Sequence, residues 1–272
     1  MQSEIATHGI RIPKIGFGTF RMQGDLCRAA VESALSIGYR HVDTAAMYGN
    51  EGEVGAAIAS SGVSRDKLHL TTKVWHDCLE PQAIRDSVAT SLDKLRVDHV
   101  DLLMVHWPSA NMDIPRVFDT FEALRAEKLT RAIGACNFNI EMVKAALDSG
   151  APIACIQVEY HVLLDQTPLL AYLRSKSIAL TAYAPIAHAM VSDIPVMKSI
   201  ARKHDATPTQ VALKWLVDQD GVIAIPKSQR PETQKSNLEC LSIVLDDEDR
   251  ARIADLPKNR RLVDPPFAPA WD

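Results

Sequence analysis

Short apolar runs alternate along this chain with longer segments in which apolar residues recur at helical spacing. The short runs predict strands and the longer segments predict amphipathic helices, a pattern typical of parallel βα units. The predicted strands lie at residues 14–20, 39–44, 68–73, 100–106, 131–136, 153–158, 178–183 and 222–225. No linker, charge run or low-complexity segment separates them. The pattern therefore predicts an α/β protein, a single (β/α)8 TIM barrel that forms one domain over residues 1–272.

Glycines support the predicted ends of the elements. Gly38 and Gly150 each follow a helical segment, at the position where a helix commonly ends in a left-handed residue. The first residues, 3–13, read as two short strands that turn at His8 and Gly9. We expect a short N-terminal β-hairpin that covers the amino-terminal mouth of the barrel.

A doubly wound open sheet is the alternative fold. It predicts a glycine-rich dinucleotide fingerprint after the first strand, but in GFGTFR the position of the third glycine is Arg21. A phosphate-binding P-loop and a GxSxG nucleophile elbow are also missing from the sequence. The barrel is thus the favoured prediction.

Composition narrows the class of partner. The chain is 47% hydrophobic and 24% charged, with a formal net charge of -4, so neither nucleic acid nor an acidic membrane surface is an expected partner. The first residues are polar and no apolar run is long enough to span a bilayer. We expect a monomeric cytoplasmic protein that acts on a small molecule.

Cysteine and histidine spacing gives no sign of a metal site. The five cysteines are odd in number and lack a CxxC pair, which argues against both a disulfide framework and a zinc knuckle. The histidines form no HExxH motif, and Glu159 and His161 alternate along a predicted strand. We therefore expect no metal and reduced thiols.

Four polar residues lie at or just beyond the carboxyl ends of three successive predicted strands: Asp43, Tyr48, Lys73 and His106. Each has a structural explanation on its own, because Asp43 could cap a helix, Lys73 could reach solvent and His106 could border the core. Catalytic groups of barrel enzymes lie at this end of the strands. Their convergence therefore predicts an active site.

These residue types suit protonation of a carbonyl oxygen as it becomes an alkoxide. Tyr48 would supply the proton, and the charge of Lys73 is expected to lower the pKa of the phenol. Asp43 would keep Lys73 protonated, and a neutral His106 would orient the carbonyl. A general acid contributes about 10²–10⁴ in rate, so reduction also requires a hydride source. A cofactor is therefore implied.

At this point the chain resembles the aldo-keto reductase family over nearly its whole length. The motifs GFGTF, HVDTAAMYGNE, TTKVW, LLMVHWP, GACNF, IQVEYH, TAYAPI and IPKS occur in the family's order. The resemblance implies that Asp43, Tyr48, Lys73 and His106 are the catalytic tetrad and that a nicotinamide cofactor supplies the hydride. Within the family the chain is most similar to bacterial 2,5-diketo-D-gluconate reductases.

The resemblance also implies cofactor contacts. Asn137 and Gln157 would bind the nicotinamide carboxamide, and Tyr183 would stack under the ring. The full set of implied cofactor-binding residues is Gly18, Thr19, Phe20, Cys136, Asn137, Gln157, Tyr183, Lys227, Ser228, Arg230 and Asn237. Two positions depart from the family, since Cys136 and Ala184 each stand where a serine is usual.

Cofactor preference depends on the segment 225–237. Lys227 and Ser228 match the family, but Thr233 stands where an arginine usually binds the 2′-phosphate. Arg230 is the cation that could replace it, and Asn237 matches an adenine contact. NADPH (NADP+) is the expected cofactor. The structural alternative is a basic, solvated turn before the last helix.

The substrate pocket is expected to be apolar with few polar groups. The candidates are Phe20, Trp75, His106, Trp107 and Trp271, with barrel-core packing as the rival explanation. The expected reaction is NADPH-dependent reduction of aldehydes and ketones: diketo acids such as 2,5-diketo-D-gluconate, 2-oxoaldehydes such as methylglyoxal, or small aldehydes. The alternative is a nucleotide-binding regulatory barrel with little turnover, against which the intact tetrad argues. An amidohydrolase-like barrel would need HxH after the first strand, which GFGTF lacks.

Overall fold

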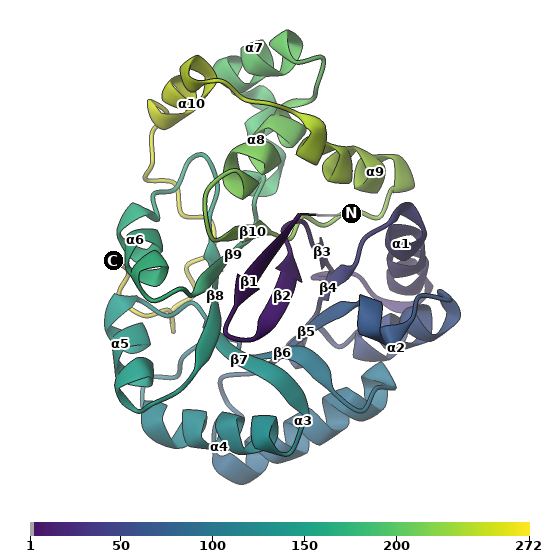
Figure 1. Cartoon of the computed structure of the whole chain (residues 1–272), viewed down its shortest axis with the longest axis vertical. Coiled ribbons are helices and arrows are strands. Elements are labelled where there is room, and N and C mark those ends of the chain that lie inside the picture. Colours follow the sequence, from purple (N-terminus) through teal and green to yellow (C-terminus); the bar gives the residue numbers. More distant parts are fainter. Residues whose placement is uncertain (1–2) are drawn as a thin grey trace.

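A computed structural model describes residues 3–272, and its centre is one parallel, curled sheet of eight strands (Figure 1). The strands are β3 (Phe17–Gly18), β4 (His41–Asp43), β5 (His69–Val74), β6 (Val100–Val105), β7 (Thr130–Cys136), β8 (Ile153–Glu159), β9 (Ala179–Tyr183) and β10 (Val222–Ala224). Each strand is hydrogen-bonded to the next one in the sequence. All eight predicted strands are confirmed, although the first has only two residues. The alternative of a doubly wound open sheet is wrong, because neighbouring strands of such a sheet are not all consecutive in the sequence, whereas these are.

Helices surround the outside of this sheet, as Figure 1 shows, and make the fold TIM-barrel-like. They are α1 (Gly24–Ile37), α2 (Glu51–Ser60), α3 (Pro81–Leu95), α4 (Ile114–Ala126), α5 (Ile140–Asp148), α6 (Thr167–Ser175), α7 (Pro195–Lys203), α8 (Pro208–Val217), α9 (Pro231–Glu239) and α10 (Asp247–Ala254). Short 3-10 turns add η1 (Ala46–Tyr48), η2 (Arg65–Lys67), η3 (Ala187–Asp193) and η4 (Cys240–Ser242). Gly38 and Gly150 have φ of 122° and 89° after α1 and α5, as predicted. No helix within residues 3–272 has the length and apolarity needed to cross a bilayer.

Each face of the sheet is covered by an apolar layer. One lies between the sheet and the helices, where α1 contributes Cys27, Val31 and Leu35. The other lies inside the curl of the sheet and includes Leu102 and Met104 of β6. Because both faces of β5 and β6 are buried, these strands read as continuous runs rather than alternating ones.

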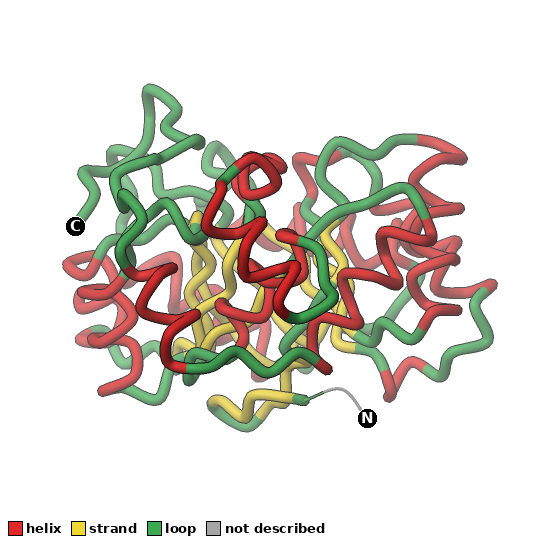
Figure 2. Tube along the Cα trace, turned by 90° about the horizontal axis from the view of Figure 1, so that it is seen from above, coloured by secondary structure: helices red, strands yellow, loops and turns green. Residues whose placement is uncertain are grey.

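The predicted N-terminal hairpin is confirmed. It pairs β1 (Glu4–Thr7) with β2 (Ile10–Pro13) through His8 and Gly9, whose φ angles of 36° and 84° suit a tight hairpin turn. The hairpin lies across the amino-terminal end of the sheet (Figures 1 and 2). Thr7 Oγ1 donates to Ala154 O at 2.7 Å, and side chains of β2 join the inner apolar layer. The hairpin is therefore packed onto the strands rather than suspended from them.

The two ends of the strand series also meet. Ile15 forms a parallel bridge with Ala224, and Gly16 N donates to Ala224 O at 2.9 Å. Further on, Gly18 N donates to Pro226 O at 3.1 Å. A Cβ at Gly18 would lie 2.9 Å from a backbone oxygen of this segment, which explains the glycine. The chain before and within β3 thus lies directly beside the chain that follows β10.

Candidate active site

A cavity of about 380 Å³ opens at the carboxyl ends of the strands, and most of the predicted site residues line it. They are Gly18, Thr19, Phe20, Asp43, Tyr48, His106, Trp107, Cys136, Asn137, Gln157, Tyr183 and Lys227. The predicted residues that do not line it are Lys73, Trp75, Ser228, Arg230, Asn237 and Trp271. The structure therefore brings together groups from many strand ends, as expected for a barrel-like sheet.

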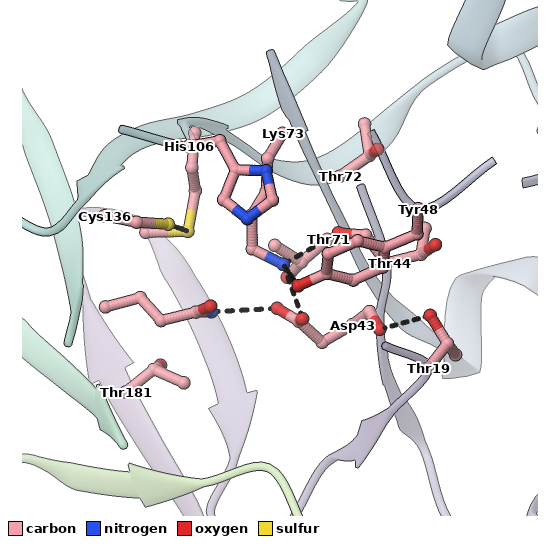
Figure 3. A network of polar contacts seen from close by, with 12 residues as sticks. Thr19, Asp43, Thr44, Tyr48, Thr71, Thr72, Lys73, His106, Cys136 and Thr181 are labelled. Carbon is pink, nitrogen blue, oxygen red and sulfur yellow. Dashed lines mark hydrogen bonds and ion pairs between the residues drawn. The ribbon is translucent and has the colours of Figure 1, made fainter. Parts of the chain in front are cut away.

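A buried ion pair lies beneath the cavity. Asp43 ends β4 and Lys73 lies near the end of the neighbouring β5, and Lys73 Nζ donates to Asp43 Oδ1 at 2.5 Å (Figure 3). The two side chains are 0% and 2% exposed. Burial by itself lowers the pKa of Lys73, but the effects of Asp43, Tyr48 and Cys136 together exceed it, so the pKa is raised. A second bond to Thr44 O at 2.8 Å fixes the ammonium.

Tyr48 lies in η1 with its hydroxyl beside this ammonium. Lys73 Nζ is 3.4 Å from Tyr48 Oη. Burial raises the pKa of Tyr48 to about 12, and the opposing charge of Lys73 offsets burial only in part. The expectation that Lys73 would bring the phenol pKa below its usual value is therefore wrong, because desolvation is the larger effect. At neutral pH the phenol keeps its proton.

His106 directly follows β6 and faces Tyr48, with ring centroids 5.4 Å apart. Burial, and then the charge of Lys73, hold the pKa of His106 well below 6.5, so the ring is neutral at neutral pH. Its Nδ1 is buried and has no hydrogen-bond partner within residues 3–272. Of the tetrad, His106 thus has a ring nitrogen without a protein partner.

The side chains predicted to contact the nicotinamide also bind Asp43 and His106. Gln157 Nε2 donates to Asp43 Oδ2 at 2.9 Å, and Asn137 Nδ2 donates to His106 O at 3.0 Å. Tyr183 Oη donates to Asn137 Oδ1 at 2.8 Å. These side chains therefore fix one another as well as lining the cavity.

Thr19 and Cys136, two further predicted cofactor contacts, each contact another residue of the protein. Thr19 Oγ1 donates to Asp43 O at 3.0 Å, so its hydroxyl supports the end of β4. Cys136 lines the cavity, but its thiol lies 3.9 Å from Met104 Sδ in the inner apolar layer. The thiol therefore contacts the inner apolar layer.

The segment between β10 and α9 continues away from the cavity. Lys227 lines the cavity and is exposed, while Arg230 is exposed and lies 3.7 Å from Glu232. Ser228 Oγ accepts a bond from Arg230 N at 3.1 Å. Asn237, in α9, is buried, and its Oδ1 has no partner among the described residues. This segment therefore places the cation of Lys227 at the cavity and polar groups farther along.

The predicted substrate-binding aromatics form a cluster rather than one wall. Trp107 lines the cavity, and Phe20 lies 5.0 Å from the Tyr48 ring. Trp75 lies outside the lining, with its ring 5.0 Å from His106, and Trp271 lies 6.1 Å from Trp107.

Sequence reasoning missed Phe267, whose ring is 5.5 Å from Trp107 and also close to Trp75. Phe267 belongs to the C-terminal segment, which has no helix or strand periodicity and so gave no signal of its place. The aromatic cluster therefore joins residues just beyond β5 and β6 to the tail.

Other missed lining residues come from loops and from the 3-10 turns η1 and η3, which carry no periodic signal. They are Arg21, Met47, Pro185, Ile186, His188 and Val263. Val263 is held by Glu159, a buried carboxylate that ends β8 and accepts from Leu262 N and Val263 N, both at 2.8 Å. The sequence signal for this contact was Glu159 itself, a charged residue at the end of an apolar strand.

Over residues 3–272 no cluster of three or more His, Cys, Asp or Glu side chains could hold a metal ion, and all five cysteines are free.

Residues 14–258 match the model of the aldo/keto reductase family. Methylglyoxal reductase DkgB of Escherichia coli O157:H7 is 42% identical, over 96% of this chain and 99% of that protein. A provisionally assigned 2,5-diketo-D-gluconic acid reductase B superposes with a TM-score of 0.95 at 42% identity, covering 100% of this chain and 98% of that one. The aldose reductase of Schistosoma japonicum gives 0.90 at 29% identity, covering 94% and 92%. The chain belongs to the aldo/keto reductase family of oxidoreductases.

Proposed function

We propose that this protein uses NADPH to reduce small aldehydes and ketones, with 2-oxoaldehydes such as methylglyoxal and diketo acids such as 2,5-diketo-D-gluconate as substrate classes. The observation that carries the proposal is the protonated phenol of Tyr48 at the cavity, 3.4 Å from the buried ammonium of Lys73. A cavity of about 380 Å³ suits a small carbonyl compound beside a nicotinamide ring. The names of the relatives support the substrate classes.

The residues present fit a nicotinamide dinucleotide. Asn237 Oδ1 is a buried acceptor without a partner in residues 3–272, which suits the amino group of adenine. Lys227 offers an exposed cation at the cavity, which suits a phosphate. The nicotinamide, when bound, supplies a hydride. The proposed holding residues are those predicted from the sequence, from Gly18 to Asn237.

Tyr48 is proposed to donate its proton to the carbonyl oxygen as negative charge develops there. The phenol is protonated at neutral pH at its ordinary pKa near 10, and burial raises that pKa further, to about 12. When the proton leaves, the phenolate forms 3.4 Å from the Lys73 ammonium, which stabilises it. Asp43 and Thr44 hold that ammonium in place. A positioned general acid contributes about 10²–10⁴ in rate.

His106 is proposed to orient the carbonyl oxygen. Its ring is neutral, so it can donate one hydrogen bond without acting as a competing acid. The ring lies against Tyr48, which brings both groups to one oxygen of a substrate in the cavity. Trp107 and Phe20 supply apolar walls that exclude water.

We also propose that the curled sheet is a closed barrel that forms one domain. The bonds of Gly16 with Ala224, and of Gly18 with Pro226, support closure between the first and last strands. A monomeric state and a cytoplasmic location stay predictions from the sequence.

The test is to follow oxidation of NADPH and of NADH with diketo acids, 2-oxoaldehydes, simple aldehydes and ketones. We expect turnover with small dicarbonyl substrates and a lower KM for NADPH. Tight nucleotide binding without turnover of any substrate would instead favour the regulatory barrel, an alternative that neither the site nor the relatives support.

A further inference from the structure

A second, larger cavity of about 830 Å³ lies at the opposite end of the strands. The hairpin β1–β2 borders it together with the beginnings of β5, β6 and β7. Six cationic side chains line it: Arg11, Arg40, Lys67, Arg125, Lys128 and Arg131. Only three carboxylates do so: Glu4, Asp66 and Asp101. In a chain whose net charge is -4, this cavity is a local concentration of positive charge.

Three of these six cations form an ion pair with a carboxylate. Arg11 pairs with Glu4 at 2.9 Å, Arg125 with Glu122 at 2.6 Å and Arg131 with Asp101 at 3.2 Å. The exposed ammonium groups of Lys67 and Lys128 have no ion pair or hydrogen bond within residues 3–272. Within residues 3–272, Arg40 donates only to the backbone oxygens of Leu35 and Tyr39. Three cations of this lining therefore form no ion pair with a described carboxylate.

His99 lines the same cavity and lies near further positive charge. Burial, and then the charges of Arg65 and Arg131, lower the pKa of His99 despite the opposing carboxylate of Asp101. Arg65 Nε and His99 Nε2 are buried and have no partner in the described chain. Asp66 is an exposed carboxylate of this cavity that forms no ion pair within residues 3–272, and Lys67 and Arg131 act on it electrostatically. A ligand that binds here would compete with Asp66.

We infer that this amino-terminal cavity binds a small polyanion carrying two or more phosphate or carboxylate groups. Lys67, at the end of η2, and Lys128, beyond α4, reach the cavity from different elements, and Arg40 from a third. Cations distributed in this way match several anionic groups on one ligand better than a single ion. The cavity volume is within the range of small-molecule sites. The site is separate from the proposed reductase chemistry, which lies at the other end of the strands.

The experiment is calorimetric titration of the full chain with inorganic tripolyphosphate, with saturating NADP+ present so that any nucleotide site is filled. Ionic strength is held constant with sodium chloride, because screening alone changes electrostatic affinity. Citrate tests a polycarboxylate ligand and acetate tests a single charge. We expect saturable binding with one site per chain for tripolyphosphate or citrate, with the tighter of the two identifying the anionic group, and no saturation with acetate.

Variants locate the site. Lys67→Gln with Lys128→Gln should weaken binding by about ten-fold for each lysine, since each removes a charged contact. Asp66→Asn should tighten binding several-fold, because it removes the competing carboxylate. Lys144→Gln with Lys176→Gln removes two exposed charges near α5 and α6 and should change nothing. Thermal melting without ligand checks that each variant is folded.

Four outcomes would overturn the inference. They are no saturable binding of either polyanion, unchanged affinity in the Lys67/Lys128 variant, equal binding of acetate, and binding in a parallel titration without NADP+ that is lost when NADP+ is present. The last would place the anion at the carboxyl-end cavity instead.

Discussion

The two ends of the sheet place their charges in opposite environments. At the carboxyl end, Lys73 is fully buried and fixed to Asp43 at 2.5 Å. At the amino end, Lys67 and Lys128 are exposed and have no fixed partner within residues 3–272. Charges in a low-dielectric interior interact far more strongly than charges in water, but taking them out of water is costly. This contrast suits the proton transfer proposed for the carboxyl end and the anion binding proposed for the amino end.

The largest expected effect is a loss of activity at the carboxyl end alone. Tyr48→Phe removes the proton donor but little surface, so carbonyl reduction should fall by about 10²–10⁴ while nucleotide binding stays near normal. Steady-state rates and cofactor-fluorescence titration measure the two. Tyr172→Phe, a tyrosine of α6 outside the cavity lining, is the matched control and should leave both unchanged. Full turnover by the Tyr48 variant would exclude it as the acid.

Removing the buried ammonium should affect both activity and stability. Lys73→Met leaves the carboxylate of Asp43 buried without its cation, which typically lowers the free energy of unfolding by about 3–5 kcal/mol. Activity should fall nearly as far as in Tyr48→Phe. Adding Asp43→Asn should recover part of the stability and none of the activity, measured by urea unfolding and by turnover. Recovery of activity in the double variant would contradict the role of the ion pair.

A smaller effect concerns acid stability at the amino end, where His41 and His69 are buried with ring centroids 4.7 Å apart. Burial lowers the pKa of His41, and that of His69 well below 6.5. Below pH 6.5 the unfolded chain takes up protons that the folded chain does not, so stability falls as pH falls. Each ring contributes at most about 1.4 kcal/mol per pH unit.

His69→Gln should therefore reduce the loss of stability between neutral pH and pH values below 6.5, measured by urea unfolding. The control is His8→Gln in the exposed hairpin turn, which should leave that loss as it is. An unchanged pH dependence in the His69 variant would show that other groups control acid unfolding.

The smallest expected effect tests whether the carboxyl end needs its second buried carboxylate. Glu159→Gln keeps the side-chain volume but removes the negative charge of the carboxylate, which accepts hydrogen bonds from Leu262 N and Val263 N. Because Val263 lines the cavity, substrate KM should rise by up to about ten-fold, as expected for one charged hydrogen bond, with kcat little changed. Hydrogen exchange at these two amides should accelerate. Unchanged exchange would show that the tail is held elsewhere.

The strands could be predicted because both faces are buried, so their apolar runs are short and continuous. The convergence of Asp43, Tyr48, Lys73 and His106 could be predicted because strand ends bring distant polar residues together. The sign of the Tyr48 pKa shift could not, since it depends on how deeply the ring is buried. The amino-end cations were also missed, because they are scattered from Arg11 to Arg131 and form no charge run.

The joint between the first and last strands has a consequence for the order in which the protein can form. Neighbouring strands are consecutive in the sequence, so most of the sheet can assemble while the chain is being synthesised. The bonds of Gly16 and Gly18 with residues 224–226 need nearly the whole chain. Phe20 and Lys227 line the same cavity from the two sides of that joint. A nascent chain that stops before β10 therefore lacks a complete site, and nucleotide binding can report the final step of folding.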